Sequence, residues 1–244
     1  MNIGGSTAVV QKLSAFVALS ETERGVLARL DAKSRVFPAG RDMVHQGQTD
    51  RTAYILASGW VCSYKLQSDG TRQIVGVQLP GDFLGLRSVL LHKSDYSFEP
   101  IVDSVALEVP KEFLLAAFSA TPRLATAFLW AAARDEAMMV EHLVGLGRRD
   151  AIKRISHFLL ELCTRLSLLG LGSTAGYDCP LTQYHLADAL GLTSVHVNRV
   201  LRDLRQAELV SFRAGRVTFL DYEGLVDLAE FDPTYLDQSR PVAA

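Results

Sequence analysis

The chain has 244 residues, 48% of them hydrophobic and 21% charged, and its formal net charge is −2. These values are typical of a soluble globular protein with two domains, and they exclude a chain that is basic throughout. No stretch approaches the roughly 20 apolar residues of a membrane span, so we expect a cytoplasmic protein without a membrane partner. Three widely separated cysteines without a CxxC pair fit a reducing compartment.

The first half of the chain predicts one short helix followed by strands. Ser20 and Glu23 form a capping-box signature, which predicts a helix from Glu21 to about Leu30. From Arg35 to about Val109, short apolar runs alternate with turn residues such as Ser68-Asp-Gly70. This spacing predicts a small antiparallel barrel or roll.

A long helix is predicted from Pro122 to about Leu146, with a hinge at Gly145-Leu-Gly147. Two neighbouring heptad-spaced rows lie on it: Leu124, Phe128, Ala131, Asp135, Met138 and His142, or Ala125, Leu129, Ala132, Glu136, Met139 and Leu143. One row would pack on the roll while the other pairs with a second subunit, or both would cover the core. The candidate dimer residues are Phe128, Ala131, Met138, Met139 and His142.

A helix-turn-helix is predicted after a second helical block, Asp150 to about Leu168, and a Gly/Ser loop, Gly170 to Tyr177. Thr182 and Thr193 are N-cap residues, and Gly191 stands where a tight turn tolerates positive φ. The second helix has an apolar stripe of Val197, Val200, Leu201 and Leu204. Its opposite face can enter a major groove.

The residues after these helices favour double-stranded DNA as the partner. Two short strand patterns flank Ala214-Gly215 and predict a β-hairpin wing, with Arg213 and Arg216 beside its tip. Residues 148–220 contain 10 Lys/Arg against 6 Asp/Glu, a net charge of +4 in a chain whose total is −2. The basic excess therefore lies on the predicted DNA-binding module.

The order of roll, long helix and winged helix-turn-helix resembles the Crp/Fnr family of bacterial transcription regulators over nearly the whole chain. The most specific motifs are Phe37-Pro-Ala-Gly40, Tyr54-Ile-Leu-Ala-Ser-Gly-Trp-Val61, Leu79-Pro-Gly-Asp-Phe-Leu-Gly85 and Leu190-Gly-Leu-Thr-Ser-Val-His-Val-Asn-Arg199. The resemblance implies an α+β fold with an N-terminal antiparallel, cyclic-nucleotide-binding-like β-roll (residues 1–121), a long dimerisation helix (122–147) and a C-terminal winged helix-turn-helix (148–244). It also implies a homodimer that reads a palindrome in successive major grooves, with RNA polymerase as a further partner.

The resemblance also assigns roles on the recognition helix. Arg199 matches the family arginine that reads guanine, and Ser194, Val195 and Asn198 occupy the other base-reading positions. Val195 replaces the family's frequent glutamate, so the usual half-site does not carry over. The candidates for phosphate contacts are Thr182, Gln183, Thr193, His196, Arg202, Arg213 and Arg216.

The candidate effector pocket departs from the cyclic-AMP-binding members. Those carry Gly-Glu and Arg-Ser pairs for the ribose hydroxyl and the phosphate, whereas this chain has Gly85-Leu86 and Tyr96-Ser97. Leu86 accepts no hydrogen bond and Tyr96 has no positive charge. We therefore expect the roll to sense an unidentified effector other than cyclic AMP in its usual pose.

Three other sensing chemistries would depend on cysteine or histidine side chains. Three cysteines do not supply the four ligands of an iron–sulfur cluster, so none is expected. Haem would use His45, Cys62 or His92 as axial ligands, although isolated His and Cys side chains are more often structural. Either Cys163 or Cys179 would be a redox switch only if it were exposed and had a low pKa, and buried inert thiols are the favoured interpretation.

Two further classes of function are alternatives to a DNA-binding regulator. In one, a ligand, redox or haem sensor uses its helix-turn-helix to dock a protein, and a weak salt dependence would distinguish that case. An enzyme is not expected, because the chain shows no nucleophile–base pair, paired-carboxylate signature, HxxxH spacing or phosphate-binding glycine loop.

Overall fold

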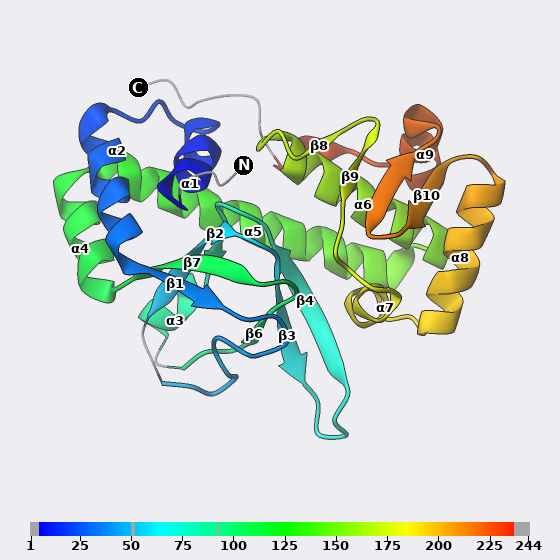
Figure 1. Cartoon of the computed structure of the whole chain (residues 1–244), viewed down its shortest axis with the longest axis horizontal. Helices are drawn as coiled ribbons and strands as arrows, with labels where there is room; N and C mark the ends of the chain where they lie inside the picture. The colour runs from blue at the N-terminus through cyan, green and yellow to red at the C-terminus, as the bar shows by residue number, and fades with distance from the viewer. Residues whose placement is uncertain (1–4, 50–51, 92, 237–244) are drawn as a thin grey trace. The chain divides into compact units, whose positions relative to one another are not determined.

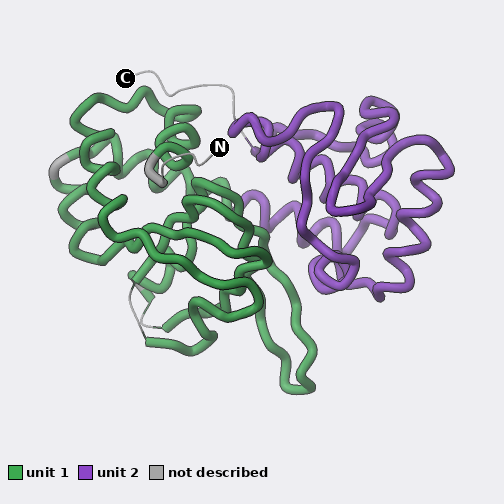
Figure 2. The backbone as a smooth tube through the Cα atoms, in the orientation of Figure 1, with its two compact units in different colours: residues 1–135, 238–244 green, residues 136–237 purple. Residues whose placement is uncertain are grey.

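The computed structural model describes residues 5–49, 52–91 and 93–236. The chain forms two compact units, coloured separately in Figure 2, and the boundary lies between Asp135 and Glu136. This boundary falls inside the long helix α5 (Pro122–Arg148). Within the described ranges, no helix is both long enough and apolar enough to cross a membrane.

The first unit contains the antiparallel roll that the sequence predicts (Figure 1). One sheet has the strand order β1-β7-β2-β5 and the other the order β4-β3-β6. The strands are β1 (Ser34–Phe37), β2 (Ala53–Ser58), β3 (Val61–Leu66), β4 (Arg72–Gln78), β5 (Phe83–Leu84), β6 (Ser97–Pro100) and β7 (Ser104–Val109). Each pair is antiparallel, and only β3 and β4 are consecutive strands joined by a short turn; the other pairs bring together strands that are separated in the sequence.

Helices complete the first unit. They are α1 (Gly5–Ser14), α2 (Glu21–Ala28), the 3-10 helix η1 (Arg29–Lys33), α3 (Leu86–Leu90) and α4 (Lys111–Ala120). The capping box before α2 is confirmed, because the Glu23 amide donates to Ser20 Oγ and the Ser20 amide donates to Glu23 Oε2. Two apolar cores result. One fills the roll around Leu56, and the other joins the roll to α1, α2, α4 and the first half of α5 around Phe128.

The second unit contains the helix-turn-helix and its wing. Its elements after α5 are α6 (Ala151–Ser167), β8 (Gly172–Ser173), β9 (Gly176–Asp178), α7 (Gln183–Leu190), α8 (Ser194–Gln206), β10 (Val210–Arg213), β11 (Arg216–Phe219), α9 (Tyr222–Ala229) and the 3-10 helix η2 (Pro233–Leu236). The stretch predicted as a Gly/Ser loop is instead a hairpin, and it joins the wing in a sheet of order β10-β11-β9-β8. At the wing's tip Ala214 and Gly215 both have positive φ, 49° and 72°, as a tight two-residue hairpin turn requires.

The predicted hinge is corrected by the structure. Gly145 and Gly147 are both helical, and α5 continues to Arg148. The break falls one residue later, where Asp150 caps α6 by accepting a hydrogen bond of 2.9 Å from the Lys153 amide. The two glycines lower the helix propensity without ending the helix.

The exposure of α5 separates the two heptad rows. Phe128 and Met138 are 1% and 7% exposed and belong to the core of their own chain. Ala131 packs against the same core as Phe128, and His142 bonds to Glu161. These four residues therefore face their own chain, which corrects their assignment to the dimer seam. The neighbouring row is exposed, at 71% for Leu129, 44% for Met139 and 70% for Leu143.

A buried polar cluster holds the second unit together around Glu161 on α6, whose side chain is inaccessible to solvent. Its carboxylate lies 3.2 Å from His142 Nε2 and accepts hydrogen bonds from Tyr235 Oη at 2.9 Å and Arg165 Nη1 at 3.3 Å. Burial raises the pKa of Glu161, but these three partners outweigh burial and lower that pKa to about 2. The carboxylate is therefore ionised and fully paired.

His157 lies beside this cluster and makes the stability of the second unit pH-dependent. Burial, reinforced by Arg149, lowers the pKa of His157 to about 4, against an opposing effect of Glu161 and Glu141. The folded state therefore holds His157 neutral, whereas the unfolded chain protonates it below about pH 6.5. Stability is present above that pH and is lost as the pH falls toward 4.

We expect His157→Phe to flatten the decline of the unfolding free energy between pH 6.5 and 4. The slope should fall by up to about 1.4 kcal/mol per pH unit. Urea unfolding across this range is the measurement. The separate decline below pH 4.5, which comes from Glu161, should survive in the variant and serves as an internal control. Identical slopes in variant and wild type between pH 6.5 and 4 would contradict the assignment.

Candidate nucleic-acid interface

Helices α7 and α8 are fixed by the caps and the turn that the sequence predicts. Thr182 Oγ1 accepts a hydrogen bond of 3.3 Å from the His185 amide, and Thr193 Oγ1 accepts one of 3.2 Å from the His196 amide. Gly191 ends α7 with φ of 62°. A Cβ on Gly191 would lie 3.2 Å from Leu146 Cδ2, so glycine serves both the left-handed turn and the close approach of α5.

Helix α8 has one buried and one outward face, as its sequence predicts. The buried residues are Val197, Val200, Leu201 and Leu204. On the other face, Val195 is 77% exposed, Asn198, Arg199 and Arg202 are exposed, and Ser194 and His196 are half-exposed. All the predicted base-reading side chains therefore lie on or near the surface of one helix.

The two arginines of this face differ in their surroundings. Arg199 makes no hydrogen bond or ion pair within the part of the chain that the structure describes. Arg202 Nε lies 3.9 Å from Asp203 Oδ1, a distance typical of a weak surface ion pair. The guanidinium of Arg199 thus keeps all its donors for an external acceptor.

The wing places two cations opposite each other. Arg213 and Arg216 are paired across the hairpin next to its tip, and both are exposed. Arg216 Nη1 bonds to Asp178 Oδ1 on β9 at 2.6 Å, which partly offsets the repulsion. Like charges in directly opposed strand positions are unfavourable, so a phosphate bound here would relieve a local cost.

The remaining phosphate candidates lie at the N-termini of α7 and α8. Thr182 and Thr193 use their oxygens as caps, which leaves the positive ends of both helix dipoles beside them. Gln183 is already hydrogen-bonded within the chain, because its Oε1 accepts a hydrogen bond of 2.6 Å from Asn198 Nδ2. The sequence placed these two residues in different groups, and the structure brings them together.

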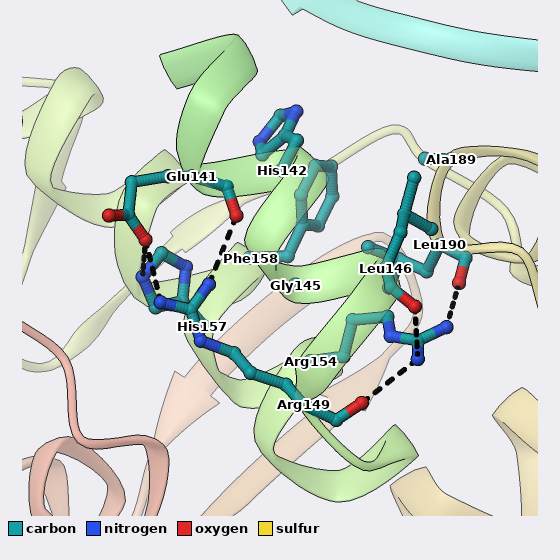
Figure 3. A pocket seen from close by; sticks show the side chains of 10 residues that line it. All are labelled: Glu141, His142, Gly145, Leu146, Arg149, Arg154, His157, Phe158, Ala189 and Leu190. Atoms are coloured by element: carbon teal, nitrogen blue, oxygen red, sulfur yellow. Dashed lines mark hydrogen bonds and ion pairs between the residues drawn. The ribbon is translucent and has the colours of Figure 1, made fainter. Parts of the chain in front are cut away.

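Arg154 anchors this module to the long helix, a role that sequence reasoning missed (Figure 3). Its Nη1 donates to the Leu190 carbonyl at 2.6 Å, and its Nη2 donates to the carbonyls of Arg149 at 2.9 Å and Leu146 at 3.3 Å. The carbonyls at helix C-termini lack intrahelical partners, and a cation there is favourable. One side chain therefore joins the ends of α5 and α7.

We expect Arg154→Ala to destabilise the second unit by about 2–4 kcal/mol, because three carbonyls at the ends of α5 and α7 lose a charged donor at once. Lys153→Ala is the matched control. Lys153 forms a surface ion pair with the exposed Glu230, so its removal should cost less than about 1 kcal/mol. Chemical unfolding of both variants measures the difference, and equal costs would contradict the anchoring role.

The candidate effector residues lie together on the roll, but each is already engaged. Gly85 has φ of 69° and precedes α3, and Leu86 packs against the apolar core. Ser97 Oγ accepts a hydrogen bond of 3.0 Å from the Gln46 amide. Tyr96 Oη accepts a hydrogen bond of 2.8 Å from Arg87 Nη1.

Arg87 is the residue that sequence reasoning missed at this site. Its guanidinium lies 5.5 Å from the centre of the Tyr96 ring, and its Nη2 forms an ion pair of 2.8 Å with Asp95. A positive charge therefore does stand beside Tyr96. Asp95 neutralises it, so an anionic ligand here would have to displace that carboxylate.

Among the residues that the structure places, the haem and redox candidates are one hydrogen-bonded histidine and three buried cysteines. His45 is exposed and bonds to Asp42 Oδ2 at 2.9 Å, while His92 lies outside the described residues. Burial raises the pKa of Cys62 and Cys179 to about 12 and also raises that of Cys163. All three cysteines are buried free thiols. A raised pKa leaves little thiolate at neutral pH, which favours inert structural thiols.

Two domain families match the chain. Residues 34–121 match "Cyclic nucleotide-binding domain", and residues 153–228 match "Crp-like helix-turn-helix domain". The first region covers the roll and α4, and the second covers most of α6 through α8, the wing and most of α9. Each match coincides with one of the two modules described above.

Whole-chain relatives agree with these matches. The "Nitrogen fixation regulation protein FixK" of Azorhizobium caulinodans is 31% identical over 212 residues, 82% of this chain and 84% of the relative. The "Fumarate and nitrate reduction regulatory protein" of Vibrio cholerae is 24% identical over 220 residues, 90% of this chain and 88% of the relative. The solved structure of FixK2 from Bradyrhizobium japonicum has a TM-score of 0.72 at 27% identity, covering 80% of this chain and 96% of that one. The chain therefore belongs to the Crp/Fnr family of transcription regulators, with a DNA-binding helix-turn-helix and a cyclic-nucleotide-binding-like sensing domain.

Proposed function

We propose that the chain acts as a homodimer that binds a palindromic operator and is switched by an effector of the roll. The observation on which this depends most is the outward face of α8, where Arg199, close in sequence to Asn198 and Val195, has no hydrogen-bond or ion-pair partner among the residues that the structure describes. In this organisation residues 1–121 sense, 122–147 dimerise and 148–244 bind DNA. RNA polymerase is the further partner proposed for such a regulator.

The dimer is proposed through the exposed row of α5. Leu129, Met139 and Leu143 repeat at the spacing of a coiled-coil seam and are exposed by 44–71%. Val140 and Val144 beside them are 54% and 40% exposed. Contiguous exposed apolar side chains on one helix are typical of a protein interface.

The contacts with DNA are proposed to divide into two kinds. Arg199 presents a fork suited to guanine O6 and N7, and Val195 offers an apolar contact for a thymine methyl group. The phosphate contacts come from the helix N-termini at Thr182 and Thr193, from His196 and Arg202, and from the wing arginines Arg213 and Arg216. The net charge of +4 over residues 148–220 supports such binding.

The effector is proposed to be something other than cyclic AMP bound as in the family's cyclic-AMP-binding members. Leu86 packs into the core, and Tyr96 is bonded to Arg87. Charge-assisted hydrogen bonds contribute about 1.5–3 kcal/mol each, so the loss of two would lower affinity by about two to four orders of magnitude.

Calorimetry with cyclic AMP should therefore show no micromolar binding, and the nucleotide should not tighten DNA binding. Arg87→Ala is the informative second variant, since it removes the cation that lies over the Tyr96 ring and donates a hydrogen bond to Tyr96 Oη. Micromolar binding by the wild type that disappears in Arg87→Ala would overturn the prediction and assign the phosphate clamp to Arg87.

Selection of bound fragments from randomised DNA by the purified protein tests the proposed function. A dimer of this kind should enrich a two-fold palindrome whose half-sites are about 10 base pairs apart, centre to centre. Repeating the selection with added cell extract tests whether a small effector is required. Enrichment of no sequence under either condition would contradict the proposal.

A further inference from the structure

A hydrogen bond joins the two helices of the helix-turn-helix at their outward side. Asn198 Nδ2 on α8 donates to Gln183 Oε1 on the first residue of α7, with a distance of 2.6 Å. Asn198 is exposed and Gln183 is half-buried, so the bond borders the surface proposed to meet DNA. It joins two side chains that are 15 residues apart in the sequence, and it involves no backbone atom.

The bond leaves a defined set of donors and acceptors on both amides. An amide NH₂ has two N–H groups and an amide oxygen accepts, so Asn198 keeps one N–H and its Oδ1 free for another partner. One donor and one acceptor on the same planar amide match adenine, which offers N7 as acceptor and N6 as donor in the major groove. Gln183 keeps its own NH₂ group, which can donate to a separate acceptor.

We propose that Gln183 is a positioning residue that holds Asn198 in the orientation that reads adenine at one position of each half-site. This inference rests on the proposed function, because it specifies how the same helix reads its operator. Val195 and Arg199, two other residues proposed to contact bases, are not held by a comparable side-chain hydrogen bond within the described ranges. Val195 is 77% exposed, and Arg199 has no side-chain partner within the described ranges.

The contribution of Gln183 to base discrimination depends on the side-chain conformational freedom that Asn198 would otherwise lose when it binds DNA. Ordering an exposed side chain on binding opposes association, and a bond that exists before binding removes part of that cost. Loss of the Gln183 bond should therefore reduce discrimination at one base pair by about two- to tenfold. A lost phosphate contact would act differently, since it weakens binding to all sequences alike.

The test measures base preference for the full-length dimer with three variants. Asn198→Ala should erase the preference for adenine at one base pair. Gln183→Ala should weaken the preference at that same base pair only, and the double variant should be no worse than Asn198→Ala. Gln183→Glu retains an acceptor for Asn198 Nδ2, so it should preserve the preference while its charge weakens binding to every sequence.

Tyr184→Ala is the matched control, since Tyr184 is the next residue of α7 and is 71% exposed. It should leave the preference at that base pair unchanged, and melting curves of all variants should coincide. Equal weakening on all sequences by Gln183→Ala would overturn the inference, as would an effect at a different base pair. A preference of Asn198 for another base would overturn the adenine assignment. If the wild type selects no sequence, the proposed function itself fails, whereas a selected palindrome that ignores Gln183 refutes only this inference.

Discussion

Leu143→Glu is expected to convert the dimer into a monomer and to lower operator affinity by about two to four orders of magnitude. Leu143 is 70% exposed on the proposed seam of α5, so the charge costs the monomer little but would be buried in the dimer. The loss of affinity follows because the second half-site no longer benefits from the effective concentration that the dimer provides. Sedimentation and operator binding, measured on the same sample, test both effects.

Met138→Glu is the comparison that separates the two heptad rows. Met138 is 7% exposed and packs within its own chain, so a charge there should lower the melting temperature. Met139→Glu, on the exposed row, should instead resemble Leu143→Glu and leave the melting curve unchanged. A monomeric Leu143→Glu protein that still bound the palindrome at full strength would refute the dimer, and a fully dimeric one would refute the seam.

Arg199→Ala is expected to cost about 1–3 kcal/mol per half-site, and so to weaken dimer binding by about one to four orders of magnitude. The loss should fall on one base pair, because a bidentate arginine discriminates guanine from the other bases. Competition among operators that carry single base-pair changes gives this profile. An unchanged preference at every position would show that the recognition helix is wrongly placed.

Arg202→Ala is the control for Arg199→Ala. Arg202 lies four residues from Asn198 along α8 and is proposed to contact phosphate. Its removal should weaken specific and non-specific DNA by the same factor, and the salt slope should become shallower by about one unit. Coincident melting curves for the two variants exclude unfolding of the module as the cause.

The parts of the structure that the sequence predicted depend on local periodicity and capping. Thr182, Gly191 and Thr193 mark the limits of α7 and α8, because an N-cap hydroxyl and a left-handed glycine are needed within a few residues of a helix end. The apolar stripe of α8 follows the same short-range geometry. Capping and periodicity are therefore reliable predictors where the interacting residues lie within a few positions of each other in the sequence.

Sequence patterns did not predict the contacts between residues that are far apart in the chain. The hairpin β8–β9 has strands of two and three residues, and it depends on Gly176, where a Cβ would come 2.1 Å from the Val217 carbonyl oxygen on β11. Arg154, Arg87 and the Gln183–Asn198 pair likewise depend on how separate elements meet. The two rows of α5 are offset by one residue and have similar apolar content, so only their burial distinguishes them.

The dependence of DNA affinity on salt, measured for the full-length protein on its selected operator and on a scrambled duplex, tests the central claim most directly. A dimer with six to ten phosphate contacts should lose about 10³- to 10⁵-fold in affinity between 50 and 200 mM salt. It should also keep a preference of at least about 10³-fold for the operator over the scrambled duplex at each salt concentration. A salt-independent affinity, or equal binding to both duplexes, would contradict a sequence-specific DNA-binding regulator and favour a helix-turn-helix that docks a protein.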